Sequence, residues 1–250
     1  MKLSVVIPTY NEARRIGPSL RRVLDYLRTR YGEGDFEIIV VDDGSCDSTV
    51  GLIEQFRAQA SELRLIRFPK NRGKGAAVRA GMLAATAEFV LFSDADLSTP
   101  IEQVEGTLEL LAGGTDVVIG SRALAGSRIL VRQNLLRESL GRLFNRLLRA
   151  FLPIPFRDTQ CGFKVFRREA AHSIFQRTRT DGFAFDVEAI LIAMHLGYAV
   201  REMPVCWIND PESKVSVVRH PARMLADLWR IRRAYAGAGP QRAPGRNLVP

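Results

Sequence analysis

Cysteine and long apolar runs are both scarce in this chain of 250 residues. The three cysteines, Cys46, Cys161 and Cys206, are scattered and odd in number, which excludes a disulfide framework and indicates a reducing compartment. No run approaches the roughly 20 apolar residues that a membrane-spanning helix needs, since the longest candidate, 189–200, contains His195. The N-terminus also has too few apolar residues for a signal peptide. We therefore expect a cytoplasmic protein whose contact with a membrane is peripheral.

Several common site patterns are missing as well. The three histidines, His172, His195 and His220, lack the mutual spacing of a metal cluster and are interpreted as structural residues. No Ser/His/Asp or Cys/His set can be assembled from the spacing. No Gly-x-Gly-x-x-Gly follows the first predicted strand, which disfavours dinucleotide binding. The basic stretch 71–75 (NRGKG) lacks the pattern of a P-loop, so a diphosphate contact and a solvated turn both stay open there.

Basic residues, by contrast, are abundant. The chain has 36 Lys and Arg against 27 Asp and Glu, a formal net charge of +9. This surplus suits an acidic partner, whether a nucleotide phosphate, an anionic lipid headgroup or a nucleic acid, and does not choose among them. An apolar content of 46% is ordinary for a globular protein, and the length suits one large α/β domain or two small ones.

Strand and helix patterns alternate through the first part of the chain. Short apolar runs predict strands at 3–7, 36–41, 63–68 and 89–93, and the segments between them have helical spacing. This alternation predicts a doubly wound, mostly parallel sheet with flanking helices and right-handed crossovers. Further on we expect helices at 101–111, 129–151, 184–196 and 221–235, and strands at 116–122, 163–166 and 199–205.

The strand at 89–93 runs directly into Asp94 and Asp96. A strand of this composition is buried on both faces, so the two carboxylates lie at its carboxyl end, the edge where α/β sheets bind ligands. Two carboxylates this close repel unless a cation lies between them, and hard divalent ions prefer oxygen ligands. A metal beside a phosphate-bearing ligand is our hypothesis, with a solvated strand-end turn as the alternative.

Two other strand ends carry polar residues that belong at the same edge. In the first, Tyr10 suits stacking on a nucleobase and Glu12 suits the ribose hydroxyls, although a capped helix start explains the same residues. In the second, the carboxylates of Asp42 and Asp43 suit a ring N–H of a base, although a simple turn also fits.

Taken together, these turns resemble the signature of family 2 glycosyltransferases with the GT-A fold, in the motifs 4–12 (SVVIPTYNE), 41–45 (VDDGS) and 94–96 (DAD). A wider set resembles the polyprenyl-phosphate hexosyltransferases, and most closely the dolichyl-phosphate β-glucosyltransferases. It comprises 120–122 (GSR), 158–164 (DTQCGFK), 185–188 (FDVE) and 213–214 (SK). The likeness covers about residues 3–220 and implies a catalytic domain at 1–220. Beyond it, the residue pattern predicts a basic amphipathic helix at 221–236, and the Gly, Pro and Arg content predicts a disordered tail at 237–250.

The resemblance also implies residue roles. The nucleotide sugar would be held by Pro8, Tyr10, Glu12, Val41, Asp43, Lys74, Asp94, Ala95 and Asp96. Asp94 and Asp96 would bind Mg²⁺ or Mn²⁺ on the donor diphosphate, with Asp96 the direct ligand. Acceptor or phosphate contacts would come from Arg122, Gln160 and Lys214. Arg122 and Asp96 would be catalytic, and Asp158 would serve as a base if the acceptor were a hydroxyl. Ser98 stands where mannosyl-transferring relatives carry Gln, which disfavours mannose.

The implied reaction is an inverting, metal-dependent transfer of a hexose, with glucose from UDP-glucose favoured, to a polyprenyl or dolichyl phosphate at the inner, cytoplasmic membrane face. The basic amphipathic helices at 129–151 and 221–235 suit an anionic membrane interface, or else ordinary packing on the sheet. A glycosyltransferase with a soluble acceptor, a nucleotidyltransferase and a nucleic-acid-binding protein are the alternatives. We expect no nucleic-acid partner, because no RNP-like aromatic pattern or zinc finger is present.

Overall fold

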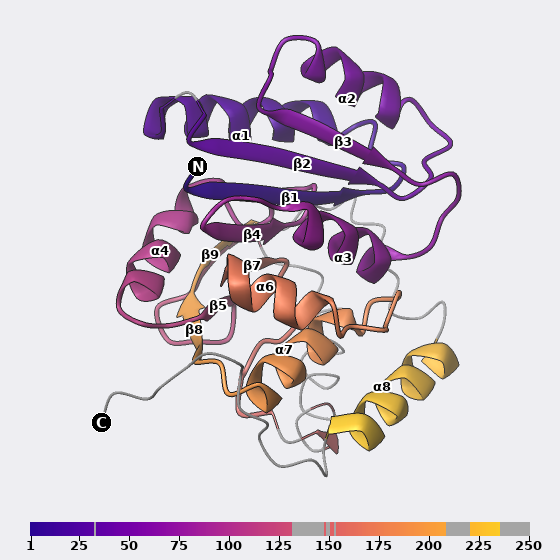
Figure 1. The fold of residues 1–250 in the computed structure, drawn as a ribbon, viewed down its shortest axis with the longest axis vertical. Coiled ribbons are helices and arrows are strands. Elements are labelled where there is room, and N and C mark those ends of the chain that lie inside the picture. Colours follow the sequence, from indigo (N-terminus) through magenta and orange to yellow (C-terminus); the bar gives the residue numbers. More distant parts are fainter. Residues whose placement is uncertain (33, 132–147, 149–150, 153, 209–220, 236–250) are drawn as a thin grey trace.

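The protein folds around one mixed sheet of seven strands (Figure 1). This structure, a computed structural model, describes all residues except 33, 132–147, 149–150, 153, 209–220 and 236–250. The strand order is β3-β2-β1-β4-β7-β5-β8, and in Figure 1 the strands follow one another from β3 in the upper part of the molecule to β8 below its middle. The strands are β1 (Leu3–Thr9), β2 (Phe36–Asp42), β3 (Leu63–Arg67), β4 (Phe89–Ser93), β5 (Val117–Ser121), β7 (Phe163–Arg167) and β8 (Val200–Pro204).

The first four strands are all parallel, as the alternation of strand and helix predicts. β1 lies between β2 and β4, and β3 pairs with the outer side of β2. β7 is antiparallel to both of its neighbours, β4 and β5, while β5 and β8 are parallel. The prediction of a mostly parallel, mixed sheet in a single domain is therefore confirmed.

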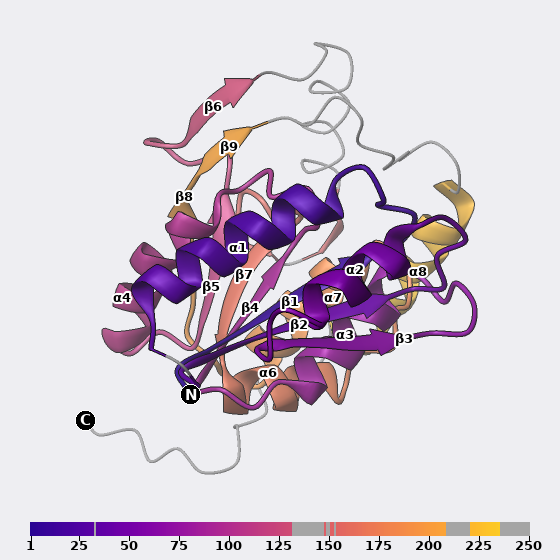
Figure 2. The ribbon, with the colours of Figure 1, turned by 90° about the horizontal axis from the view of Figure 1, so that it is seen from above.

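Helices cover both faces of the sheet (Figures 1 and 2). On one face pack α1 (Ile16–Arg30), α2 (Thr49–Arg57), the 3₁₀ turn η1 (Ile101–Gln103) and α4 (Val104–Ala112). On the other pack α3 (Lys74–Ala84), α6 (Arg168–Phe175), α7 (Phe185–His195) and α8 (Pro221–Tyr235). Successive residues of β2 alternate between the two layers: Ile38 and Val40 face the first, Ile39 and Val41 the second. Burial on both faces explains why the strand is apolar without interruption.

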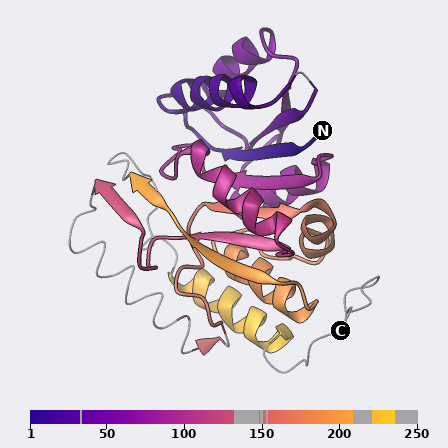
Figure 3. The ribbon, with the colours of Figure 1, turned by 90° about the vertical axis from the view of Figure 1, so that its left-hand side faces the viewer.

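A separate two-stranded ribbon extends from the body of the molecule (Figures 2 and 3). It consists of β6 (Arg128–Val131) and β9 (Cys206–Ile208), which pair in parallel. The backbone N–H of Ile208 donates to Ser98 O at 2.8 Å, so the ribbon is attached to the turn that follows β4. The ribbon therefore lies next to the carboxyl end of the central strands.

The ribbon corrects one sequence prediction. We expected a helix from 129 to 151, but Ile129–Val131 belong to strand β6. Their apolar side chains also fit a strand, and pairing with the distant β9 decided between the two conformations. The helix prediction from 132 onward falls mostly outside the described residues, as does the predicted tail at 237–250. Helix α6 and strand β9 were not predicted. Helix α8 lies at the predicted position.

Candidate active site

The carboxyl ends of β1, β2 and β4 lie side by side at one edge of the sheet. Thr9, the last residue of β1, is in register with Asp42, the last residue of β2, and β4 pairs with the other side of β1. All three polar turns follow these ends directly, so the predicted convergence of the three motifs is confirmed. In the described part of the chain, the two non-glycine residues with positive φ are Asn11 (φ 55°) and Leu97 (φ 48°), and both lie in these turns. Such conformations concentrate at functional sites.

The turn after β4 presents Asp94 and Asp96. Leu97 N–H donates to Asp94 O at 3.1 Å, which closes the turn, and Ser98 N–H donates to Asp96 Oδ1 at 3.0 Å. Asp94 N–H donates to Gly162 O at 3.0 Å, so the turn is also joined to the segment that precedes β7. Both carboxylates remain partly exposed at the edge of the sheet.

Two basic side chains approach these carboxylates. Lys74 Nζ lies 2.7 Å from Asp94 Oδ1, and Arg15 lies 3.9 Å from Asp96 Oδ2. Burial raises the pKa of Asp96 and the charge of Asp94 raises it further, although hydrogen bonds from Ser98 oppose the shift. The pair therefore gains from an additional cation, as the sequence predicts for carboxylates this close.

The donor atoms present here fit a divalent metal. No group of three or more His, Cys, Asp or Glu that could hold an ion occurs among the described residues. Mg²⁺ in particular is usually held by only one or two carboxylates and takes its other ligands from substrate phosphates and water. Asp94 and Asp96 supply two hard oxygen ligands next to the basic side chain of Lys74, and this set suits a metal that arrives with a diphosphate.

Asp43 holds the basic loop at 71–73 in place. Its buried carboxylate accepts from Arg72 N at 2.7 Å, Gly73 N at 2.9 Å and Asn71 Nδ2 at 2.9 Å. Burial raises the pKa of Asp43, and the two backbone donors partly offset this. Val41 and Pro8 are paired across β2 and β1 below the same edge, and the residue Tyr10, which follows the end of β1, is 43% exposed. Tyr10 thus offers an accessible aromatic face where the sequence predicts nucleoside binding.

Several backbone N–H groups of the loop at 71–75 are already bonded within the protein. Gly75 N and Ala76 N donate to Asp181 O at 2.8 and 3.3 Å, while the N–H groups of 72 and 73 donate to Asp43. The carbonyl of Asp181 therefore occupies the N-terminus of α3. A Cβ on Gly73 would lie 2.3 Å from that same oxygen, so only glycine fits. The side chain of Lys74, the first residue of α3, is the basic group of this loop that reaches Asp94.

Glu12 is engaged by a residue that our sequence reasoning missed. Arg15 donates to both carboxylate oxygens of Glu12, with Nε–Oε2 at 2.6 Å and Nη2–Oε1 at 2.7 Å. The same guanidinium faces Asp96. Arg15 therefore joins the first turn to the turn after β4. Its spacing of three residues from Glu12 at a helix start is a recognisable pairing signal.

Arg122 and Asp158 form a close pair beyond β5. The Asp158 carboxylate accepts from Arg122 Nε at 2.6 Å, Arg122 Nη2 at 2.9 Å, Arg122 N at 3.0 Å and Gln160 N at 3.2 Å. Burial favours a neutral Asp158, but the charge and hydrogen bonds of Arg122 outweigh it and hold the pKa of this carboxyl below its ordinary value. The guanidinium lies 5.5 Å from the ring centroid of Trp207 in β9.

Lys214, predicted to meet phosphate, lies outside the described residues.

The sequence of the chain is similar to those of known proteins. A family model described as glycosyl transferase family 2 matches residues 4–175. The chain is 36% identical over 250 residues to the dolichyl-phosphate beta-glucosyltransferase of Saccharomyces cerevisiae, covering 93% of this chain and 75% of that protein. It is 34% identical over 245 residues to the protein of the same name from Homo sapiens, covering 94% and 76%.

Solved structures confirm the predicted GT-A fold. Glucosyl-3-phosphoglycerate synthase from Mycobacterium tuberculosis, in complex with Mn²⁺, UDP-glucose and phosphoglyceric acid, has a TM-score of 0.62 at 22% identity, covering 95% of this chain and 80% of that one. Mannosyltransferase PcManGT from Pyrobaculum calidifontis, in complex with GDP-Man and Mn²⁺, has a TM-score of 0.58 at 26% identity, covering 93% and 61%.

Proposed function

The chain belongs to glycosyl transferase family 2, and from this premise we propose that it transfers glucose from UDP-glucose to a polyprenyl or dolichyl phosphate with inversion at the anomeric carbon. The names of the yeast and human relatives support the donor sugar and the lipid acceptor. The carboxylates after β4 would hold Mg²⁺ or Mn²⁺, which supplies neutralisation of the charge that develops on the departing nucleoside diphosphate.

The pairing of Asp158 with Arg122 is the observation that carries the choice of acceptor. A hydroxyl acceptor needs a general base to remove its proton, and Asp158 was the predicted candidate. Among the described residues, the Asp158 carboxylate accepts four hydrogen bonds from the chain itself, three of them from Arg122. A phosphate monoester, with a second pKa of about 6, is largely dianionic near neutrality and needs only a cation to position it. We assign that positioning to Arg122.

In this scheme the chain's own residues bind and orient the two substrates. Tyr10 stacks on the base and Asp43 fixes the loop that carries Lys74. Lys74 donates to the diphosphate. An acceptor phosphate oxygen, oriented by Arg122, forms the new bond to the anomeric carbon as the bond from that carbon to the diphosphate breaks. No proton has to be removed from the acceptor, so no carboxylate acts as a base.

A panel of donors and acceptors tests this proposal. We expect glucose transfer from UDP-glucose to a short polyprenyl phosphate, at least about tenfold faster than from GDP-mannose, and its loss in excess chelator. Transfer to 3-phosphoglycerate alone would contradict the lipid acceptor. Release of pyrophosphate from UTP and glucose 1-phosphate would instead identify a nucleotidyltransferase.

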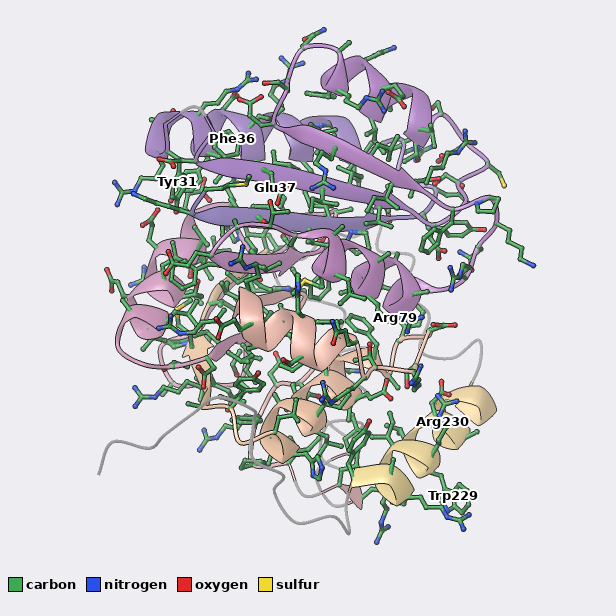
Figure 4. The ribbon with its side chains drawn as sticks, in the orientation of Figure 1. Tyr31, Phe36, Glu37, Arg79, Trp229 and Arg230 are labelled. Atoms are coloured by element: carbon green, nitrogen blue, oxygen red, sulfur yellow. The ribbon has the colours of Figure 1, made fainter. Side chains whose placement is uncertain are left out.

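We further propose that the protein contacts the cytoplasmic face of a membrane peripherally. None of the helices in the described ranges is long and apolar enough to cross a bilayer. Exposed apolar side chains in the described part of the chain include Ile129, Leu130 and Val131 in β6, which are 38%, 62% and 46% exposed, and Trp229 on α8, which is 58% exposed. Figure 4 shows Trp229 projecting outward from α8. Arg233 lies 5.4 Å from the Trp229 ring centroid, a pairing of aromatic and basic groups that suits an anionic interface.

Vesicle flotation tests the membrane contact. We expect the protein to float with vesicles that contain anionic lipid and to float less when Leu130→Ser or Trp229→Ser removes an exposed apolar side chain. Arg22→Gln is the surface control and should float normally. It lies in α1, on the face of the sheet opposite to α8. If both serine variants float as well as the unaltered protein, these two surfaces do not contact the membrane.

A further inference from the structure

Two lysines flank the ring of Phe92 in β4. Lys74 Nζ lies 5.4 Å from the ring centroid and Lys164 Nζ lies 5.5 Å from it. Lys164 stands directly across from Phe92 in the antiparallel pair of β4 and β7. Its side chain is only 2% exposed, which is rare for lysine and calls for partners within the protein.

Lys164 has two such partners on different elements. Its ammonium group forms an ion pair with Asp186, in the first turn of α7. It also donates to Cys161 O at 2.7 Å. The ammonium therefore joins helix α7 to the segment 158–162, which precedes β7.

This segment contacts both halves of the candidate site. Gly162 O accepts from Asp94 N, and a Cβ added to Gly162 would lie only 1.8 Å from Asp94 Oδ2. The backbone of the segment thus lies directly against the Asp94 carboxylate. At its other end, Asp158 holds Arg122. A displacement of the segment would move both Asp94 and Arg122.

Stability alone is a poor explanation for a buried ion pair. Replacing both partners of such a pair by apolar residues is often neutral or stabilising, because two charges no longer have to be removed from water. Burial raises the pKa of Asp186 in spite of the opposing charges of Lys164 and Lys74, which is the mark of a carboxylate that is costly to bury. The hydrogen bond from Lys164 to Cys161 O is a contact that an apolar pair cannot reproduce.

We propose that Lys164, with Asp186 as its counter-ion, is a positioning residue that fixes the segment 158–162 and through it sets Asp94 on the donor side and Arg122 on the acceptor side. This deepens the proposed function and rests on it for the identity of the two substrates. The effect on the segment itself does not depend on either substrate.

The reactivity of the Cys161 thiol measures directly how firmly the segment 158–162 is held in place. In a background of Cys46→Ser and Cys206→Ser the remaining thiol is Cys161, which is buried and 1% exposed. We expect Lys164→Met to raise the rate at which a thiol reagent modifies Cys161 by at least tenfold. The double variant Lys164→Met/Asp186→Leu, which leaves no unpaired buried charge, should unfold at a temperature near that of the unaltered protein and keep the raised reactivity.

The affinity for Mn²⁺ measures how a displacement of the segment 158–162 affects Asp94. With Mn²⁺ and UDP as probes, followed by electron paramagnetic resonance, we expect both variants to bind Mn²⁺ about 10- to 100-fold more weakly, the usual effect of losing an outer partner of a metal ligand. Gly162→Ala, which forces a methyl group against Asp94, should weaken binding similarly. Gly51→Ala, with nothing within 4 Å of the added Cβ, is the matched control and should not.

The outcomes separate this inference from the proposed function. Unchanged Cys161 reactivity in both lysine variants, or unchanged Mn²⁺ affinity in the double variant, would overturn the positioning role. If the unaltered protein does not bind Mn²⁺ with UDP but Lys164→Met still exposes Cys161, the metal-dependent function fails while the control of the segment by Lys164 stands.

Discussion

Replacing Asp96 by asparagine is expected to reduce transfer by at least about 1,000-fold while the protein stays folded. Asparagine keeps the shape of the side chain and an oxygen that can accept from Ser98 N, so the turn after β4 is preserved. What it removes is the negative charge proposed to hold the metal. The loss of one group that stabilises developing charge typically reduces the rate by a factor of about 100 to 1,000. For Asp96, the proposed direct ligand of the metal, we expect a reduction at or above the upper end of this range.

The stability of this variant follows from the environment of Asp96. Burial and then the neighbouring charge of Asp94 raise the pKa of Asp96, so its ionised form is disfavoured in the folded protein. A neutral side chain should therefore leave the unfolding temperature unchanged or raise it.

Steady-state kinetics at saturating Mn²⁺, combined with thermal unfolding, checks both expectations. Glu102→Gln, which removes an exposed carboxylate in the turn η1, controls for the loss of a surface charge and should be fully active. Near-normal turnover by Asp96→Asn would refute the metal role of this residue, as would normal turnover of the unaltered protein in excess chelator.

Replacing Arg122 by methionine is expected to reduce transfer to polyprenyl phosphate by at least about 100-fold, since it removes the cation proposed to orient the acceptor. Alone, this change also leaves Asp158 buried without its counter-ion, which costs about 3–5 kcal/mol. The double variant Arg122→Met/Asp158→Asn avoids that penalty and should stay folded with the same loss of transfer. Restored transfer by the double variant would show that Arg122 serves stability alone.

The pH profile of Asp158→Asn distinguishes a positioning role of Asp158 from a role as base. If Asp158 only orients Arg122, the variant should lose about tenfold in kcat/KM and keep the shape of its profile. The rate should then fall as pH decreases below about 6, where the acceptor phosphate takes up its second proton and becomes a poorer nucleophile. If Asp158 is instead the base, the variant should lose far more activity, and the acidic limb should disappear with it.

Much of the scaffold could be read from local patterns. The period of apolar residues placed β1 to β4 and the helices between them, because a strand buried on both faces and a helix with one apolar stripe leave different spacings. The three polar turns were also visible, and parallel strands with right-handed crossovers bring their carboxyl ends to one edge. The sequence alone therefore places Asp94 and Asp96 at this edge.

Residues 129–131 show where local pattern fails. The apolar side chains of Ile129, Leu130 and Val131 fit either a helix or a strand. Pairing with β9, more than 70 residues later in the chain, selected the strand. A partner that distant leaves no signal in the spacing of the segment itself.

The sequence by itself determined the α/β architecture, the edge at which the site lies and the residue types that suit a metal and a nucleotide, because these follow from short-range periodicity and from the chemistry of single side chains. Tertiary structure alone decided what each charged group faces. It set Asp158 against Arg122, placed the carbonyl of Asp181 on the N-terminus of α3, and buried Lys164 between Asp186 and the segment that contacts Asp94. These contacts join residues far apart in the chain, and electrostatic interaction depends on distance in space and on exclusion of water, neither of which the order of residues records.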